Sequence, residues 1–182
     1  MEQVKKKGAS WQVALIGLKL LLICAIVAGV VSFVYALTAD QYEKNIRETK
    51  NQAIGEIFGR SELICEELPF DGEETVYEVK ENGVLIGYCV EVKSAGFGGD
   101  IEMMVGCTLD RKILGVSIVS LSETPGLGAK VNEDAFLSQY AGKGEGVELG
   151  TDVDAISGAT ISSRAVTDGV NRATEALSEL LG

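Results

Sequence analysis

The 182-residue sequence contains no histidine, and its four cysteines are widely spaced, with no Cys-x-x-Cys pair. Without histidine, the Ser-His and Cys-His pairs that activate the nucleophiles of the commonest hydrolases are absent. A zinc or iron–sulfur site made by this chain alone is disfavoured too, because such sites need clustered cysteine or histidine ligands. We therefore predict no catalytic residue and no metal site, and we expect any chemistry to come from a cofactor.

The cysteines fall in segments of different character. Cys24 lies in a long apolar run, whereas Cys89 and Cys107 lie in shorter apolar runs of strand-like composition. A thiol in such a run packs as a small hydrophobic group. A disulfide among Cys65, Cys89 and Cys107 remains the alternative for an exported domain, because disulfides persist in oxidising compartments.

Basic side chains are scarce, with 16 Lys and Arg against 27 Asp and Glu and a formal net charge of −11. The first 39 residues hold four of the basic side chains and one of the acidic ones, which leaves 12 basic against 26 acidic in the remainder. Nucleic-acid binding requires clustered cationic side chains, so we predict no nucleic-acid partner. Solubility is the simplest interpretation of the acidic excess.

Charge is almost absent from residues 9–39, where Lys19 is the only charged side chain. The run 20–39 is by itself long enough to cross a bilayer. A cleavable signal peptide is the alternative, but the apolar run exceeds a typical signal core and its one candidate cleavage site, ALTA at 36–39, is weak. We predict a retained transmembrane helix.

Lys5, Lys6 and Lys7 precede this span and the acidic domain follows it. The positive-inside rule then places the N-terminus in the cytoplasm and the soluble domain outside the cell (inner) membrane. The same lysines would form the basic start of a signal peptide in the alternative interpretation.

The soluble part shows strand patterns followed by helical ones. Residues 40–72 predict a membrane-proximal helix and then a linker that contains Pro69 and Gly72. Strands are expected at 75–80 and 84–92, joined by an Asn-Gly hairpin turn, and at 101–109 and 113–121, joined by the turn 110–112. The runs 84–92 and 112–120 share an aliphatic pair and a glycine, which indicates a weak repeat of the hairpin layout.

Helices are expected after the strands. A short helix is predicted at 131–140, followed by a Gly- and acid-rich loop at 141–154 with a brief strand at 147–149. The last helix has an apolar stripe of helical period that should pack on the sheet. The stripe consists of Val166, Val170, Ala173, Leu177 and Leu180. The predicted fold class is α+β, with an antiparallel sheet packed by helices.

Two Gly-containing loops carry candidate site residues. SAGFGGD at 94–100 is either a flexible loop or a place where small residues let a ligand approach while Phe97 offers a flat apolar contact. It lacks the order of glycines found in the GxGxxG fingerprint. SETPGLGAK at 122–130 predicts a type II turn at Pro125-Gly126, with the polar Glu123 at a strand end.

The segment DAISGATISS, residues 154–163, leads into the last helix. Its hydroxyl groups, on Thr160, Ser162 and Ser163, follow a Gly-Ala pair that leaves the backbone uncrowded. Unpaired N–H groups and the helix dipole favour an anion at such a start. The alternative is an ordinary Ser or Thr helix N-cap, which on spacing alone is the commoner case.

The order of these features resembles one family. A membrane anchor, then GFGG, ETPGLG and DAISGAT before a helix, is similar to the flavin-binding G subunit of the Rnf electron-transport complex. The C subunit of the sodium-pumping NADH:quinone reductase is related to it, but is usually longer than this chain. The resemblance implies FMN attached covalently, through a phosphoester, to Thr160 by a flavin transferase.

The resemblance also implies the remaining site residues and the domain layout. Phe97 stands where the family frequently has tyrosine. The matching cofactor-binding positions are Asp154, Ser157, Gly158, Ala159 and Thr160, followed by Ser162 and Ser163; Glu123, Thr124, Gly126, Leu127 and Gly128 in the second motif; and Phe97 and Gly98 in the first loop. The expected layout is a cytoplasmic N-terminus (1–8), a transmembrane anchor (9–39), a membrane-proximal helix and linker (40–72) and an extracytoplasmic FMN-binding domain (73–182).

The implied function is that of a membrane-anchored electron-transfer subunit in an ion-translocating ferredoxin:NAD⁺ oxidoreductase, with the other membrane subunits as partners. The equivalent subunit of the sodium-pumping quinone reductase, or another exported FMN carrier, is the nearest alternative. Two alternatives come from other classes: a module that binds a phosphorylated ligand reversibly, and an assembly platform without a redox role.

Overall fold

The computed structural model describes residues 3–182, with side chains described at residues 11, 13–35, 37–38 and 44–182. The chain divides into two compact units, Met1–Arg47 and Glu48–Gly182, which we describe separately. Helix α1, Gln3–Phe58, supplies the first unit and the beginning of the second. Lys5 to Lys7 and the ends of the ALTA site lie outside the residues whose side chains are described.

The first unit contains the predicted span. Within α1, Val13–Tyr35 is long and apolar enough to cross a membrane, with a mean hydropathy of 2.7, and none of that window is buried in protein. A free-standing apolar helix of this length is compatible with a single-pass anchor. The helix continues without a break through residue 40, where the predicted membrane-proximal helix begins.

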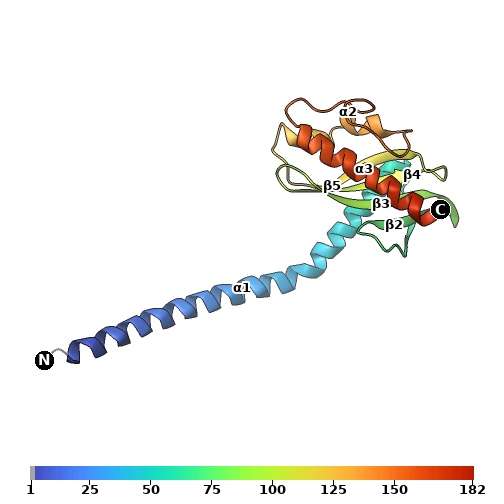
Figure 1. Ribbon diagram of the computed structural model, residues 1–182. Coiled ribbons are helices and arrows are strands. Elements are labelled where there is room, and N and C mark those ends of the chain that lie inside the picture. The colour runs from blue at the N-terminus through green and yellow to red at the C-terminus, as the bar shows by residue number, and fades with distance from the viewer. Residues whose placement is uncertain (1–2) are drawn as a thin grey trace. The chain divides into compact units, whose positions relative to one another are not determined.

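The second unit is built on a five-stranded antiparallel sheet in the order β1-β2-β3-β4-β5, so each strand pairs with its neighbour in sequence (Figure 1). The strands are β1 Ile64–Leu68, β2 Thr75–Glu81, β3 Val84–Ala95, β4 Asp100–Cys107 and β5 Ile113–Leu121. Both predicted hairpins are confirmed. Asn82 and Gly83, at the tip of the first, have φ of 51° and 80°, the positive values that Asn-Gly turns accept.

Strand β1 corrects one prediction, because it lies in the segment that the sequence indicated as a linker. It has two adjacent glutamates and no regular alternation of buried and exposed side chains. Its backbone is ordered by pairing with β2, from Ile64↔Lys80 to Leu68↔Val76. An edge strand of this kind is stabilised by ladder hydrogen bonds more than by its own apolar content, and composition alone does not reveal it.

Helix α3, Thr160–Leu181, lies along one face of the sheet (Figure 1). The predicted stripe is confirmed: Val166, Val170, Ala173 and Leu177 are fully buried, and Leu180 packs against the same core. The α+β class follows directly, because a sheet with one apolar face needs a helix to cover it.

The segment between β5 and α3 differs from the predicted single helix. It forms a 3₁₀ turn η1, Gly128–Asn132, a single α-helical turn α2, Asp134–Leu137, and a second 3₁₀ turn η2, Ser138–Tyr140. Glu133 has an extended backbone, with φ −81° and ψ 140°, and this interrupts the helix. The predicted strand at 147–149 is reduced to one bridge, Leu149↔Val153.

The opposite face of the sheet receives the last turns of α1. Ala53 and Ile54 join Val79, Cys89 and Met104 in a second buried cluster. At its edge, the Lys50 ammonium donates to Glu91 at 2.8 Å, and the Tyr77 hydroxyl donates to the same carboxylate at 3.2 Å. Burial, together with the Glu91 charge, raises the pKa of Tyr77, so the phenol remains a donor.

Three glycines on neighbouring strands form the seat for the end of α1. A Cβ added at Gly106 would lie 2.3 Å from Ile57 Cγ2, and one at Gly87 would lie 2.8 Å from the Phe58 ring. Gly115, which pairs with Gly106, faces the same Ile57 side chain at 3.5 Å. The glycine shared by the two predicted hairpin runs is therefore explained by close approach of this helix.

We expect Gly106→Ala to lower the free energy of unfolding by about 1 to 3 kcal/mol, because the added methyl group overlaps Ile57 in a closely packed site. Denaturant unfolding of the detergent-solubilised chain measures this. Gly144→Ala is the control, since a Cβ there meets nothing within 4 Å. Equal stability of the two variants would contradict the glycine seat.

All four cysteines are free, and Cys89 and Cys107 are buried in the clusters on opposite faces of the sheet. The prediction that they pack as small hydrophobic groups is confirmed. Burial raises the pKa of Cys107 to about 12 and that of Cys89 well above its usual value. Both thiols are therefore protonated at neutral pH.

We expect a maleimide reagent at pH 8 to leave Cys89 and Cys107 unmodified in the folded chain and to label both in denaturant, because the thiolate is the reactive form. Peptide mass spectrometry after each treatment gives the result. Labelling of either buried thiol at the rate of Cys65, which is half-buried, would overturn this expectation.

Candidate functional site

Three segments that are far apart in the sequence meet in one cavity of about 330 Å³. They are the 94–100 loop, the turn after β5 and the start of α3. The lining residues are Phe97, Glu123, Thr124, Leu127, Gly128, Gly158, Ala159, Thr160, Ile161 and Ser162. Nine of these ten belong to the set predicted from the sequence, so the structure brings most of the candidate residues together.

The turn after β5 forms as predicted. Gly126 has φ of +76°, and the Leu127 amide donates to the Thr124 carbonyl at 3.2 Å, which together define a type II turn around Pro125. This turn carries Leu127 towards the start of α3, where its Cδ1 would lie 3.0 Å from a Cβ at Gly158. Glycine is required at 158 for this contact and for its φ of +80°.

Helix α3 begins without a side-chain cap, so the Ser or Thr N-cap interpretation is wrong. Its N-cap is Ala159, and no side chain bonds to the first-turn amides as a cap. Within the described residues, the amides of Thr160, Ile161 and Ser162 make no backbone hydrogen bond, and the first helical bond joins the Ser163 amide to Ala159. These unpaired donors line the cavity, at the positive end of the helix dipole.

The three hydroxyl groups of this turn have different surroundings. Ser163 is buried, and its oxygen accepts from the Ile156 amide at 3.1 Å and donates to the Ala159 carbonyl at 3.0 Å. Ser162 is buried and donates to Glu123 at 3.0 Å. Thr160 is exposed, and its hydroxyl has no hydrogen-bond partner among the described residues. Thr160 therefore offers the one accessible and unengaged hydroxyl of the three.

Glu123 joins the three segments. Its side chain is 8% exposed; Oε1 accepts from the amides of Phe97 at 2.7 Å and Gly98 at 3.3 Å, while Oε2 accepts from Ser162. A buried carboxylate requires such donors, because desolvation otherwise penalises its charge heavily. The carboxylate thus serves as an internal acceptor, and its two oxygens are engaged within the protein.

The outer rim of the cavity is apolar. Phe97 is 70% exposed, Leu127 44% and Ile161 56%. Ile161 was not predicted, although an aliphatic side chain next to three first-turn hydroxyl groups is the signal that could have identified it. An apolar rim beside unpaired amides fits a ligand with a flat aromatic part and a phosphate, which is the chemistry of FMN.

Several predicted residues lie outside the cavity lining. Gly126 shapes the β5 turn, Gly98 donates its amide to Glu123, and Ser163 faces the interior. The remaining two, Asp154 and Ser157, are exposed, and the Asp154 amide donates to Gln139 Oε1 at 2.8 Å. Their proposed roles in recognition remain predictions, since a residue read by another enzyme needs exposure and not contact with the cavity.

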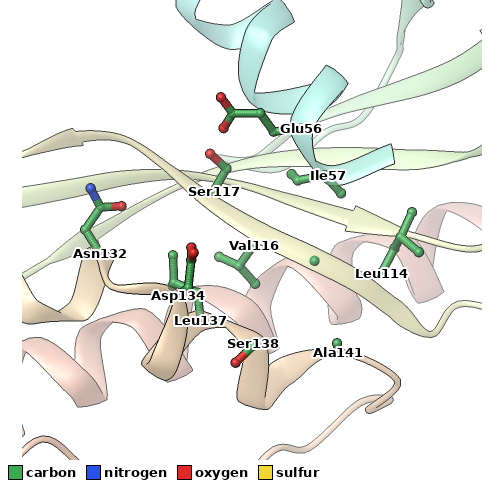
Figure 2. A pocket seen from close by; sticks show the side chains of 11 residues that line it. Glu56, Ile57, Leu114, Val116, Ser117, Asn132, Asp134, Leu137, Ser138 and Ala141 are labelled. Carbon is green, nitrogen blue, oxygen red and sulfur yellow. The ribbon is translucent and has the colours of Figure 1, made fainter. Parts of the chain in front are cut away.

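A larger cavity, of about 480 Å³, lies beside β5 between the last turn of α1 and α2. Figure 2 shows Glu56 and Ile57 on one side of the strand and Leu137 and Ser138 on the other. None of the predicted site residues lines it. Cavity size therefore does not identify the site; the convergence of the three motifs does.

Comparisons with known proteins agree with this location. Residues 96–175 match the FMN-binding domain family, a range that includes the cavity lining. The chain is 31% identical, over 206 aligned residues, to the G subunit of the Na⁺-translocating ferredoxin:NAD⁺ oxidoreductase complex of Acetobacterium woodii, with 99% of each chain covered. It is 32% identical to the G subunit of the ion-translocating oxidoreductase complex of Methanosarcina acetivorans, covering 87% of this chain and 91% of that one.

Among solved structures, the C subunit of the Na⁺-translocating NADH-quinone reductase from Parabacteroides distasonis has a similar fold. The TM-score is 0.62 at 20% identity, with 80% of this chain and 96% of that chain covered. At this level of identity the similarity establishes the fold alone.

The hydroxyl assignments predict opposite outcomes for two substitutions in the chain without a ligand. Ser163→Ala should lower the free energy of unfolding by about 1 to 2 kcal/mol, because it removes the acceptor of the Ile156 amide. Thr160→Ala should change it by less than about 0.5 kcal/mol, since Thr160 is exposed and makes no such bond. Denaturant unfolding compares them, and a large loss in Thr160→Ala would show that this hydroxyl is structural.

Proposed function

The chain belongs to the family of G subunits of the ion-translocating oxidoreductase (Rnf) complexes, and we propose that it carries FMN as a phosphoester on Thr160. On the comparisons the protein is a flavoprotein electron-transfer subunit. The covalent link is our proposal, and one observation carries it: of the three hydroxyl groups at the start of α3, only that of Thr160 is both exposed and unengaged within the described residues.

Attachment requires chemistry that this chain does not supply. A threonine hydroxyl is not acidic, so a partner enzyme must remove its proton while a metal ion polarises the pyrophosphate of a flavin adenine dinucleotide. The Thr160 oxygen then bonds to the FMN phosphorus, the pyrophosphate bond breaks, and AMP leaves. The exposed position of Thr160 at a loop–helix junction allows a flavin transferase to reach it.

The residues of the cavity would then hold the attached group. The amides of Thr160, Ile161 and Ser162 are placed to offset phosphate charge without a cation, and none of the lining residues is Lys or Arg. Phe97, Leu127 and Ile161 would contact the flat ring system and exclude water from part of it. The bound flavin supplies the electron-transfer chemistry, and these contacts tune it.

We infer that α1 anchors the protein in the cell membrane through Val13–Tyr35, with the N-terminus in the cytoplasm and the flavin domain outside. Its partners would be the other membrane subunits of the complex, which uses electron flow between ferredoxin and NAD⁺ to move sodium ions or protons. Covalent attachment suits this location, because no free flavin pool is then needed to keep the site loaded.

Reversible binding of a phosphorylated ligand is the second candidate. It is favoured by the same unpaired amides, which would hold a phosphate whether or not an ester forms. The two functions differ in one measurable property, since a phosphoester survives denaturation and a reversible complex does not.

We expect the wild type, co-expressed with a flavin transferase, to show flavin fluorescence that persists on a denaturing gel. Thr160→Ala should abolish the signal, and Thr160→Ser should retain it because the hydroxyl remains. Ser162→Ala is the matched control and should keep the fluorescence, since that hydroxyl is buried against Glu123. A wild type without bound flavin, or a Thr160→Ala variant that still carries it, would refute the proposed linkage.

A further inference from the structure

We propose that Glu123 is the positioning residue of the flavin site: its buried carboxylate ties the GFGG loop to the first turn of α3 and sets both before any cofactor is attached. This inference rests on the proposed function for its consequence, the efficient loading of Thr160. The tether itself can be tested without a flavin.

The contacts of Glu123 reach segments that no other side-chain hydrogen bond connects among the described residues. Oε1 accepts from the Phe97 and Gly98 amides, 26 and 25 residues earlier in the chain, and Oε2 accepts from Ser162, 39 residues later. Each bond to an ionised acceptor is stronger than one between neutral groups. Three such bonds on one buried group hold the loop, the end of β5 and the helix start in a fixed arrangement.

Two glycines shape the space that the carboxylate occupies. A Cβ at Gly96 would lie 2.1 Å from Oε1, and one at Gly128 would lie 2.4 Å from Oε2 and 3.0 Å from the Ser162 oxygen. These distances are shorter than any non-bonded contact allows, so larger residues would expel the carboxylate. Both glycines fall in the GFGG and ETPGLG motifs, which gives these motifs a common purpose.

The donors around Glu123 distinguish a tether from a ligand contact. Both oxygens are satisfied within the protein, and none of the ion pairs among the described residues includes Glu123. The carboxylate therefore acts through the residues it holds: Phe97 on the rim, and Ser162, which it keeps out of competition with Thr160.

The choice of substitution follows from these donors. In Glu123→Gln the amide oxygen can accept from Phe97 and Gly98, while the amide nitrogen faces Ser162, whose hydroxyl can rotate to accept. Glu123→Gln therefore preserves the tether and removes only the charge. Glu123→Ala removes the tether. Val79→Ala, in the buried cluster on the opposite face, lowers stability without touching the site and serves as the matched control.

The first measurement is amide hydrogen exchange of the detergent-solubilised full chain made without a transferase. Glu123→Ala should speed exchange at Phe97 and Gly98 by about tenfold or more, the factor expected when a bond to a charged acceptor is lost. Glu123→Gln should change it much less, and Val79→Ala should not affect these two amides selectively. Unchanged exchange in Glu123→Ala would overturn the tether, whatever the fate of the flavin proposal.

The second measurement is the fraction of chain that carries flavin after co-expression with the transferase, compared at equal thermal stability. Glu123→Ala should lose most of the loading, Glu123→Gln should retain most of it, and Val79→Ala should load like the wild type. Equal losses in Glu123→Ala and Val79→Ala would reduce Glu123 to a stability role and overturn the inference. A defect in Glu123→Gln as deep as in Glu123→Ala would do so too, because charge and not positioning would then be decisive.

Discussion

The site depends on the requirement that a buried carboxylate be surrounded by donors. Glu123 stands at the end of β5, where the chain leaves the sheet, and its burial is tolerated because two loop amides and the Ser162 hydroxyl meet it there. The same requirement fixes where those donors must be, so one side chain determines the distance between the GFGG loop and the start of α3. Glycines at 96 and 128 follow from this, since any Cβ would occupy the place of an oxygen. The cavity is the space left on the outer side of this junction.

The sheet carries two demands on its opposite faces. One face buries the stripe of α3 and so fixes the helix whose first turn forms the site. The other face is flattened by Gly87, Gly106 and Gly115, which lets Ile57 and Phe58 approach the strands closely. The last turns of α1 are therefore part of the domain's core, and the chain enters the domain through a packed helix and not through a flexible linker. A cofactor held on the α3 side is thus supported by a sheet that is braced on its other side.

Periodicity predicted the parts of the fold that are governed by local rules. The Asn-Gly hairpin and the α3 stripe each have a pattern with one physical cause, and both were recovered. Strand β1 was missed because its order comes from pairing with β2, a contact that no local window contains. The candidate residues came from motif order, and the structure brings nine of the cavity-lining residues together from that set. Ile161 and the absence of a side-chain cap on Ala159 could not be predicted, because both depend on how Ser162 and Ser163 are drawn inward by tertiary contacts.

That inward turn gives the DAISGATISS segment its meaning. In the sequence, Thr160, Ser162 and Ser163 are three similar hydroxyl groups near an amide-rich helix start, and any of them would serve as an N-cap. In the structure, Ser163 is used to close the turn at Ile156 and Ser162 is used to satisfy Glu123. Neither caps the helix, so the first-turn amides remain available to an anion, and Thr160 remains available to an enzyme. The two properties that covalent phosphoester attachment needs, an accessible hydroxyl and donors for the phosphate, thus arise from one arrangement: the neighbouring hydroxyl groups are engaged on the inside.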